Sequence, residues 1–300
     1  MLGVDTTPLF RFLKLAVGVF RPPPGRNRVL LAWTYGIVCH TLFAAAVLSM
    51  ITAMFFGLSR SLGTVPAPWS WLANAALLLQ FPIAHSVLLS ARGSRWLSRL
   101  GPGNHGRTLS TTSFAIIASV QLLALFALWT PSGTIWWQAS GALFWLICAL
   151  YATAWLLLIK ASYDAGAEVQ SGALGWMSLA QNIKPIFPDM PTTGLFRIIR
   201  QPIYVSFALT LWTVPVWTPD QLFLATVLTA YCLLAPVLKE RRFKRRYGNQ
   251  FVAYQRVTPY ALPRVRPARH GQNPENLQYG QNQYGHNQYV HNQYEHNNKQ

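Results

Sequence analysis

The sequence is poor in charged residues, and above all in acidic ones. Only 11% of its 300 residues are charged, with 8 Asp and Glu against 25 Lys and Arg. In soluble globular proteins about a quarter of the residues are charged. Together with a hydrophobic share of 52%, this scarcity argues against an ordinary soluble domain and predicts an all-α integral membrane protein.

Cysteine is also scarce. Cys39, Cys148 and Cys232 lie far apart, each within an apolar segment. Their number and spacing exclude a disulfide framework and the patterns typical of a metal site. We therefore expect buried thiols that pack as small apolar side chains, and no bound metal.

The N-terminus lacks the features of a secretory signal, because Arg11 and Lys14 interrupt the apolar run and no small-residue cleavage site follows. Residues 9–17 instead place these two cations on one side of a helix and apolar residues broadly on the other, before Pro22-Pro23-Pro24-Gly25 ends it. Residues 1–28 are thus predicted to form a cytosolic arm. It is either a helix in the membrane interface or an ordinary terminal extension.

Long apolar runs are what the sequence does contain. They cover residues 29–57, 69–90, 112–130, 136–159, 203–217 and 221–238. A helix needs about 20 apolar residues to cross a bilayer, and the run 203–217 is shorter and contains Pro215. We expect about six transmembrane helices, the last two in a tight hairpin, within a membrane body over residues 29–270.

Basic residues are distributed unevenly around these runs. If the six segments alternate in direction and the N-terminus is cytosolic, every Lys and Arg except Arg60 lies on the cytosolic side. This positive-inside pattern predicts cytosolic N- and C-termini, in a bacterial inner membrane. It explains the net charge of +17 without nucleic acid as a partner. The basic stretch 239–246 suits the anionic headgroups of membrane lipids.

Residues 271–300 form a low-complexity tail, in which a five-residue unit such as QYGHN recurs. The tail contains almost nothing that can be buried, so we expect it to be disordered. Its histidines His286, His291 and His296 lie in a flexible repeat, which does not indicate a specific metal site.

The most informative stretch is Arg200-Gln201-Pro202-Ile203-Tyr204. A residue before proline favours an extended backbone, and proline suits the first position of a helix. Arg200 is therefore expected just ahead of a helix N-terminus, whose unpaired N–H groups attract a carboxylate or phosphate. Tyr204 lies near the start of the same helix.

Glu240 is the only acidic residue between Asp220 and Glu275, and it lies among basic residues. Two interpretations are open for this lone carboxylate. It forms an ion pair with a neighbouring arginine, or it accepts hydrogen bonds from a cationic or hydroxyl-bearing ligand under the helix ends.

A longer pattern joins these two regions. Thr193-Gly194-Leu195-Phe196-Arg197 leads into Arg200-x-Pro202-x-Tyr204, and Glu240, Tyr247-Gly248-x-x-Phe251-x-x-Tyr254 and Pro259 follow. Over residues 190–262 this pattern resembles the core of the isoprenylcysteine carboxyl methyltransferase-like superfamily. The whole layout, with His85-Ser86 and Pro215-Val216-Trp217-Thr218, is similar to bacterial methanethiol S-methyltransferases.

The resemblance implies a membrane-embedded enzyme that transfers a methyl group from S-adenosylmethionine to the sulfur of a small thiol. Arg200 and the helix N-terminus suit the carboxylate of this cofactor, Glu240 suits its ammonium group or ribose hydroxyls, and an aromatic ring favours its sulfonium by about 0.5–2 kcal/mol. The implied catalytic residues are Arg197, Arg200 and Gln201. The implied cofactor-binding residues are Arg200, Pro202, Tyr204, Glu240, Tyr247 and Tyr254.

Three positions depart from the superfamily pattern. Gln201 replaces its histidine, Ser206 its glycine, and Lys239 the first of two glutamates. Lys239 reverses a charge near the expected cofactor, and a unit charge at about 4 Å is worth roughly 4 kcal/mol at an effective dielectric of about 20. The acceptor therefore stays open between a small thiol, an isoprenylcysteine carboxyl group and a phospholipid or other lipid-soluble substrate. A non-catalytic protein with a degenerate motif is also open.

His40 and His85 lie in the cytosolic halves of the first two apolar segments. Ionisable residues inside a membrane are functional candidates. The two histidines either line a substrate channel, ligate haem as in the denitrification-associated, non-catalytic relatives of the superfamily, or hydrogen-bond to neighbouring helices. Asn74 and Gln80 are predicted to hydrogen-bond between helices.

Overall fold

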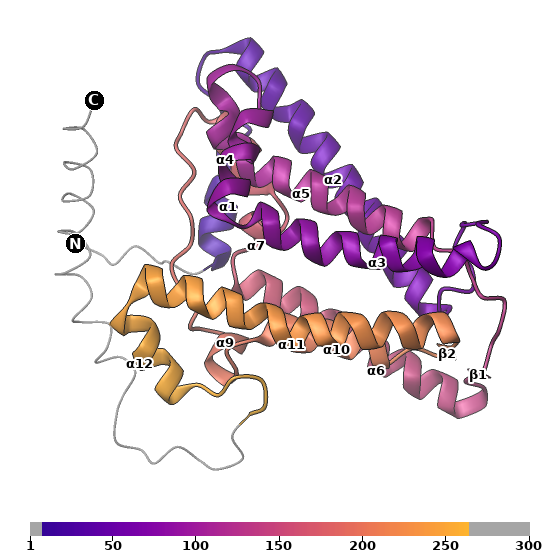
Figure 1. Cartoon of the computed structure of the whole chain (residues 1–300). Helices are drawn as coiled ribbons and strands as arrows, with labels where there is room; N and C mark the ends of the chain where they lie inside the picture. Colours follow the sequence, from indigo (N-terminus) through magenta and orange to yellow (C-terminus); the bar gives the residue numbers. More distant parts are fainter. Residues whose placement is uncertain (1–7, 264–300) are drawn as a thin grey trace. The chain divides into compact units, whose positions relative to one another are not determined.

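The computed structural model describes residues 8–263, which fold mainly as helices (Figure 1). The predicted tail over 271–300, with its three histidines, lies outside the described residues. So do the first seven residues of the N-terminal arm.

Among the described residues, five helices are long and apolar enough to cross a membrane. They are α2 (Arg26–Phe55), α3 (Trp69–Leu88), α5 (Gly106–Ala127), α6 (Gly141–Asp164) and α11 (Pro219–Tyr247). Most of their apolar surface faces outward. In α6, for example, only 17% of the most apolar 18-residue stretch is buried inside the protein. Contiguous apolar surface of this extent marks contact with lipid in place of water. The chain is therefore an integral membrane protein.

Shorter elements connect these helices. They are α1 (Pro8–Gly18), α4 (Ala91–Leu100), the 3-10 turn η1 (Gly103–His105), α7 (Ala167–Gln170), α8 (Ala173–Ala180), α9 (Leu195–Ile198), α10 (Pro202–Trp212) and α12 (Asn249–Val257). Two strands of two residues, β1 (Trp137–Gln138) and β2 (Val216–Trp217), pair antiparallel with Trp137 opposite Trp217.

Several helix boundaries differ from those predicted from the apolar runs. The run 112–130 corresponds to α5, which begins six residues earlier, at Gly106. The run 136–159 corresponds to α6, which begins only at Gly141 because Trp137 and Gln138 pair with β2. Helix α11 continues past residue 238 to Tyr247, so Glu240 and the basic residues after it are helical. Backbone hydrogen bonds of a helix continue where its side chains become polar. The limits of an apolar run are therefore a poor guide to the first and last residues of the helix.

The predicted fifth segment, 203–217, is only partly helical. Helix α10 has 11 residues, a length of about 16 Å, whereas the apolar core of a bilayer is about 30 Å thick. It ends at Trp212, three residues before Pro215, and the chain then enters β2. A sixth transmembrane helix therefore stays a prediction.

Helix α10 packs against α6 and α11 (Figure 1). Near its C-terminus, Gln221 Nε2 donates a hydrogen bond of 2.7 Å to the carbonyl of Leu211. Just ahead of its N-terminus, Gln201 reaches Glu240, near the other end of α11. The two helices are thus antiparallel neighbours.

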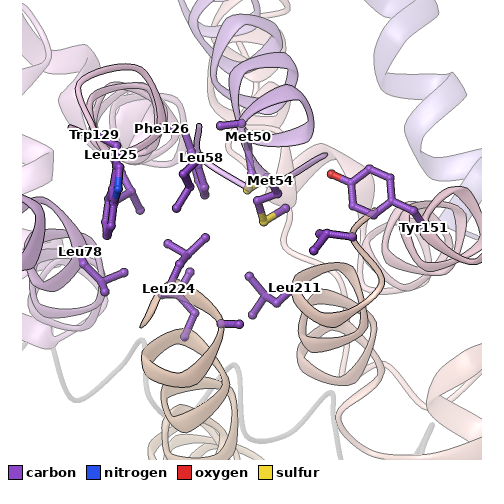
Figure 2. Close-up of a cluster of buried hydrophobic side chains, with 14 of the residues drawn as sticks. Met50, Met54, Leu58, Leu78, Leu125, Phe126, Trp129, Tyr151, Leu211 and Leu224 are labelled. Carbon is purple, nitrogen blue, oxygen red and sulfur yellow. The ribbon is translucent and has the colours of Figure 1, made fainter. Parts of the chain in front are cut away.

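A buried apolar cluster holds the long helices together at their centre. Figure 2 shows its labelled members, among them Met54, Leu78, Phe126, Leu211 and Leu224, which come from five different helices. Trp129 is completely buried. Its indole N–H donates to Asp220 at 3.0 Å, which supplies the hydrogen bond that a buried indole needs.

Polar side chains also join the helices. Asn74 on α3 donates to the carbonyl of Thr130 at 2.8 Å and accepts from its N–H at 2.9 Å. Gln80 donates to the carbonyl of Gln121 on α5 at 3.0 Å. The prediction of an interhelical hydrogen bond is confirmed for Gln80, whereas Asn74 bonds the connection that follows α5, because Thr130 lies past the end of that helix at Ala127.

The N-terminal helix α1 rests on α8. Arg11 binds Glu168 at 2.8 Å, and Gln181 donates to the carbonyl of Leu15 at 2.9 Å. Phe12 packs into a second buried cluster, around Trp176. Arg11 therefore faces the protein, whereas the position of α1 in the membrane interface stays a prediction.

Candidate functional site

The motif begins at a glycine that the end of α6 holds in place. Gly194 has φ 60° and ψ −133°, a conformation that residues with a Cβ rarely adopt. The Asp164 carboxylate accepts a hydrogen bond from the N–H of Leu195 at 2.9 Å and pairs with Lys160. A Cβ at position 194 would overlap this carboxylate. The contact fixes the start of α9, and with it Phe196.

Arg200 ties together three parts of the chain. Its Nε donates to Glu240 at 2.9 Å, and its Nη1 donates to the carbonyls of Gln255 and Thr258 at 3.0 and 2.7 Å. Its backbone N–H donates to Pro259 at 2.9 Å. Arg200 thus fastens the residues that follow α12 to the start of α10.

Glu240 is the centre of this network. Its Oε1 accepts from Arg200 Nε and from Gln201 Nε2, the latter at 2.7 Å. Its Oε2 accepts from Gln255 Nε2 at 2.7 Å and, at 3.5 Å, from Arg200 Nη2. A carboxylate has about four acceptor positions, so protein donors fill all of them. Of the two interpretations of Glu240, the ion pair with an arginine is what the structure shows.

Two of the departures from the superfamily pattern touch each other. The side-chain carbonyl of Gln201 accepts from Lys239 Nζ at 3.2 Å, while its amide group donates to Glu240. Gln201 is buried and bridges the two charged neighbours. A glutamine at 201 and a lysine at 239 are thus complementary. Ser206, the third departure, is buried within α10.

The ammonium of Lys239 lies among three aromatic rings. Its Nζ is 5.4 Å from the ring centres of Phe196 and Phe243 and 5.7 Å from that of Tyr204. These rings come from α9, α11 and α10. We refer to Phe196, Tyr204 and Phe243 as the aromatic cage.

Tyr254 closes one side of the site. Its hydroxyl donates to the carbonyl of Phe196 at 2.5 Å. Burial raises the pKa of Tyr254 above its ordinary value, Arg200 opposes this and the Glu240 carboxylate adds to it. The phenol therefore stays protonated and remains a hydrogen-bond donor.

The other predicted site residues lie nearby with different surroundings. Pro202 is buried at the first position of α10, as predicted for a proline at a helix start. Tyr247 stacks with Phe243, 5.4 Å away, and lies beneath Arg246. The side chain of Arg197 is exposed, and it forms no ion pair or hydrogen bond with any residue in the range 8–263.

A small cavity lies between the aromatic cage and the Glu240 network. It is lined by Phe196, Gln201, Lys239, Phe243 and Tyr254, among others, and has a volume of about 10 Å³. That is the volume of about one water molecule. A larger ligand can bind here only if these side chains move apart.

A wider groove of about 590 Å³ runs between α3 and α11. It is mostly apolar, with Ile83 and Leu234 in its walls, and Ser86, Tyr231 and Arg241 add polar groups. Arg241 and Glu240 are consecutive residues, so the groove reaches the level of the site.

The two histidines are separately engaged. His40 Nε2 accepts a hydrogen bond of 3.0 Å from the indole of Trp176. His85 packs between Phe81 and Phe114, with ring centres 5.3 and 5.0 Å away. His40 would have to give up this bond to ligate haem through Nε2. Within residues 8–263, no three His, Cys, Asp or Glu side chains gather as a metal site would require.

Sequence reasoning missed Gln255 and the aromatic cage. Gln255 lies on the face of α12 that turns towards α11, one residue after Tyr254. Phe196 was part of the motif, but nothing in its spacing indicated that it would meet Phe243 around one ammonium. Only the packing of α9, α10 and α11 brings these residues together.

The chain is similar to several methanethiol S-methyltransferases and to nurim. The chain is 27% identical over 194 residues to methanethiol S-methyltransferase 2 of Bradyrhizobium diazoefficiens, which covers 65% of the chain and 73% of that protein. It is 26% identical to a methanethiol S-methyltransferase of Crocosphaera subtropica, over 79% of the chain and 92% of that protein. It is also 28% identical to human nurim, over 59% of the chain and 69% of nurim. No protein-family model and no solved structure matches the chain.

Proposed function

We propose that the protein is a membrane-embedded methyltransferase that uses S-adenosylmethionine and methylates the sulfur of a small thiol. Two of the three relatives described above are named methanethiol S-methyltransferase. The observation that carries the proposal is the contact between Arg200 and Glu240 at 2.9 Å. It joins the two halves of the motif at one point, beside the small cavity that Phe196 and Phe243 of the aromatic cage also line.

The donor set fits the chemistry of this cofactor. Arg200 suits a carboxylate, Glu240 suits an ammonium or ribose hydroxyl, and the aromatic cage suits a positively charged sulfur. To bind the cofactor, Arg200 and Glu240 must first give up some of the hydrogen bonds that they make within the chain. When bound, the cofactor supplies an activated methyl group. Because the present cavity has a volume of only about 10 Å³, binding requires Lys239, Phe243 or Tyr254 to move outward.

The chain's own residues have two tasks in this reaction. The cage and the Glu240 network align the reacting groups and exclude water, which is most of what an in-line displacement requires. The basic end of α11, with Arg241 and Arg242, lies beside the groove and would lower the pKa of a thiol there, favouring the nucleophilic thiolate.

The distribution of basic residues indicates the membrane and the orientation of the protein in it. We propose a bacterial inner membrane with both termini in the cytosol, since the basic residues gather at the end of the body that holds the site. The basic residues within 241–246, part of the stretch 239–246, then lie at the level of anionic headgroups and bind them, while Lys239 occupies the aromatic cage.

Calorimetric titration of S-adenosylmethionine into the detergent-solubilised protein tests the proposal. We expect binding in the micromolar range, and weakening by about tenfold or more in Glu240→Gln. Asp189→Asn is the matched control, because it makes the same change in charge on an exposed residue. Methyl transfer is then measured with methanethiol, a prenylated cysteine and a phospholipid as acceptors, and the thiol is expected to react. No detectable binding to the parent protein would contradict the proposal.

A second candidate is a non-catalytic membrane protein. It is favoured by the saturation of Glu240, whose four acceptor positions are filled by protein donors, and by the closed cavity. It predicts no S-adenosylmethionine binding and no methyl transfer. A haem-binding form of this candidate predicts a Soret band in the purified protein, which is lost in His40→Ala or His85→Ala.

A further inference from the structure

The surroundings of Lys239 are unusual for a lysine. Its ammonium has the Gln201 carbonyl at 3.2 Å and three aromatic rings within 5.7 Å. Glu240, the adjacent acid, is occupied by Arg200, Gln201 and Gln255, and among the described residues Lys239 forms no ion pair of 4.0 Å or less. The Gln201 carbonyl and the aromatic cage are therefore the groups that surround its charge.

An aromatic cage recognises charge more than the identity of the cation. Ring faces carry negative potential and attract an ammonium, a sulfonium or a quaternary ammonium alike. The cage also borders the cavity beside Glu240. Three rings from three helices around one positive charge thus form a cation site, which a residue of the chain occupies.

We propose that the aromatic cage is a binding site for the cationic group of a ligand, and that Lys239 is a tethered competitor that holds the cage until the ligand displaces it. With respect to the ligand's identity, this rests on the proposed function, since the cation would then be the sulfonium of S-adenosylmethionine. Lysine suits the role because its charge sits on a flexible stem of four carbons. A short outward rotation of that stem empties the cage.

This arrangement makes Lys239 a determinant of affinity and selectivity. A group tethered beside the site competes at a high effective concentration. The apparent affinity for a cationic ligand is therefore its intrinsic affinity multiplied by the fraction of molecules in which Lys239 has left the cage. The more often Lys239 occupies the cage, the weaker the ligand binds. A neutral ligand loses less, because it gains little from the rings and can bind while Lys239 stays in the cage, without repulsion between two positive charges.

The test compares S-adenosylmethionine with S-adenosylhomocysteine, which has the same nucleoside and amino-acid groups but a neutral sulfur. Lys239→Met keeps most of the length of the side chain, one atom less, and removes the charge. We expect Lys239→Met to tighten S-adenosylmethionine binding by about tenfold and S-adenosylhomocysteine binding by less than about threefold, measured by calorimetry. Lys244→Met, on the same helix and exposed, is the control and should change neither affinity. An equal gain for both ligands, or no gain, would overturn the proposal.

A second measurement separates this proposal from the proposed function. Tetramethylammonium carries only the charge, and its binding is followed by saturation-transfer NMR on its methyl protons. We expect it to bind Lys239→Met more strongly than the parent protein, and to lose that binding in Lys239→Met/Phe243→Leu. Binding of this ion without any binding of S-adenosylmethionine would support the cage and contradict the proposed function. If S-adenosylmethionine binds equally well to the parent protein and to Lys239→Met, and tetramethylammonium binds neither, the proposal of a cation site in the cage is contradicted and the proposed function is not.

Discussion

Gln201 and Lys239 each account for the residue type found at the other position. Lys239 in place of a glutamate would leave an unpaired ammonium, but Gln201 offers it a carbonyl and keeps an amide group for Glu240. Swapping one of the two alone would leave a buried polar group without its partner, which costs about 1–3 kcal/mol. The departures from the superfamily pattern thus form a coupled pair.

Gly194→Ala is predicted to destabilise the site. The residue has φ 60° and ψ −133°, and a Cβ there would overlap the Asp164 carboxylate. The backbone strain alone amounts to about 1–3 kcal/mol, and the overlap adds to it. We expect a clearly lower midpoint of thermal unfolding, followed with a thiol-reactive dye that reports exposure of the buried Cys39 and Cys232.

Gly133→Ala is the control for this prediction. Gly133 also has a positive φ, 76°, but a Cβ there would meet nothing within 4 Å. The midpoint of thermal unfolding should fall by much less in Gly133→Ala than in Gly194→Ala. If both substitutions lower the midpoint equally, the contact with Asp164 has no role in positioning the motif.

At the scale of elements, a few specific contacts attach the short helices α10 and α1 to their neighbours. Helix α10 is fastened at both ends to α11, by Gln201 at one end and by Gln221 at the other. Helix α1 is attached to the body by Arg11 and by its apolar face. Helices this short are not stable alone, so these contacts decide whether they form.

Arg11→Gln is predicted to release α1. Glu168 is only 1% exposed, and loss of its partner leaves a buried carboxylate without a counter-charge. Because Arg11 itself is partly exposed, we expect a loss of about 2–3 kcal/mol, somewhat below the range for fully buried pairs. Amide hydrogen exchange should show faster exchange across residues 10–18 than in the parent protein.

The double variant Arg11→Gln/Glu168→Gln should recover part of this loss, because two amides can hydrogen-bond without a buried charge. A double variant as unstable as the sum of both single variants would show that the two residues act independently. The ion pair would then not be the contact that holds α1.

At the scale of the whole molecule, the two ends of the helical body differ in charge. At one end Leu62 and Gly63 donate to the carbonyls of Ala127 and Trp129, and Thr218 donates to that of Gly57. Arg60 lies among these connections, stacked on Phe56. The opposite end carries Arg200, Glu240 and the basic turns of α11. Between Gln201 and Val216 the chain therefore passes from one end of the body to the other, although α10 itself is short.

We predict that this passage is a sixth membrane crossing, with both termini in the cytosol. A green fluorescent protein fused after residue 263 should be fluorescent, and alkaline phosphatase fused there should be inactive. A cysteine introduced at residue 133, in the connection between α5 and α6, should react with a membrane-impermeant maleimide from outside. Active phosphatase after residue 263 would show five crossings and place the site on the outer side.

The sequence alone determined the class of the protein and which stretch of the chain, residues 190–262, carries the motif. Long apolar runs leave few alternatives to helices in lipid, because backbone groups there must be satisfied within the helix. Pro202 predicted the start of α10 correctly, because its fixed φ suits the first position of a helix. The extended backbone expected of Gln201 was wrong, since its φ is −121° and its ψ is 48°. The interhelical contact of Gln80 also followed from polarity in an apolar segment, whereas Asn74 bonds the connection after α5.

Only the tertiary structure decided how the site residues are used. The sequence left Glu240 open between an ion pair and a ligand contact, and gave no sign of Gln255 or of the aromatic cage. These depend on side chains from α9, α10, α11 and α12, up to 60 residues apart in the chain, meeting at one point. Local patterns report periodicity and turns, because those act over a few residues. Which charge meets which partner depends on the packing of distant helices.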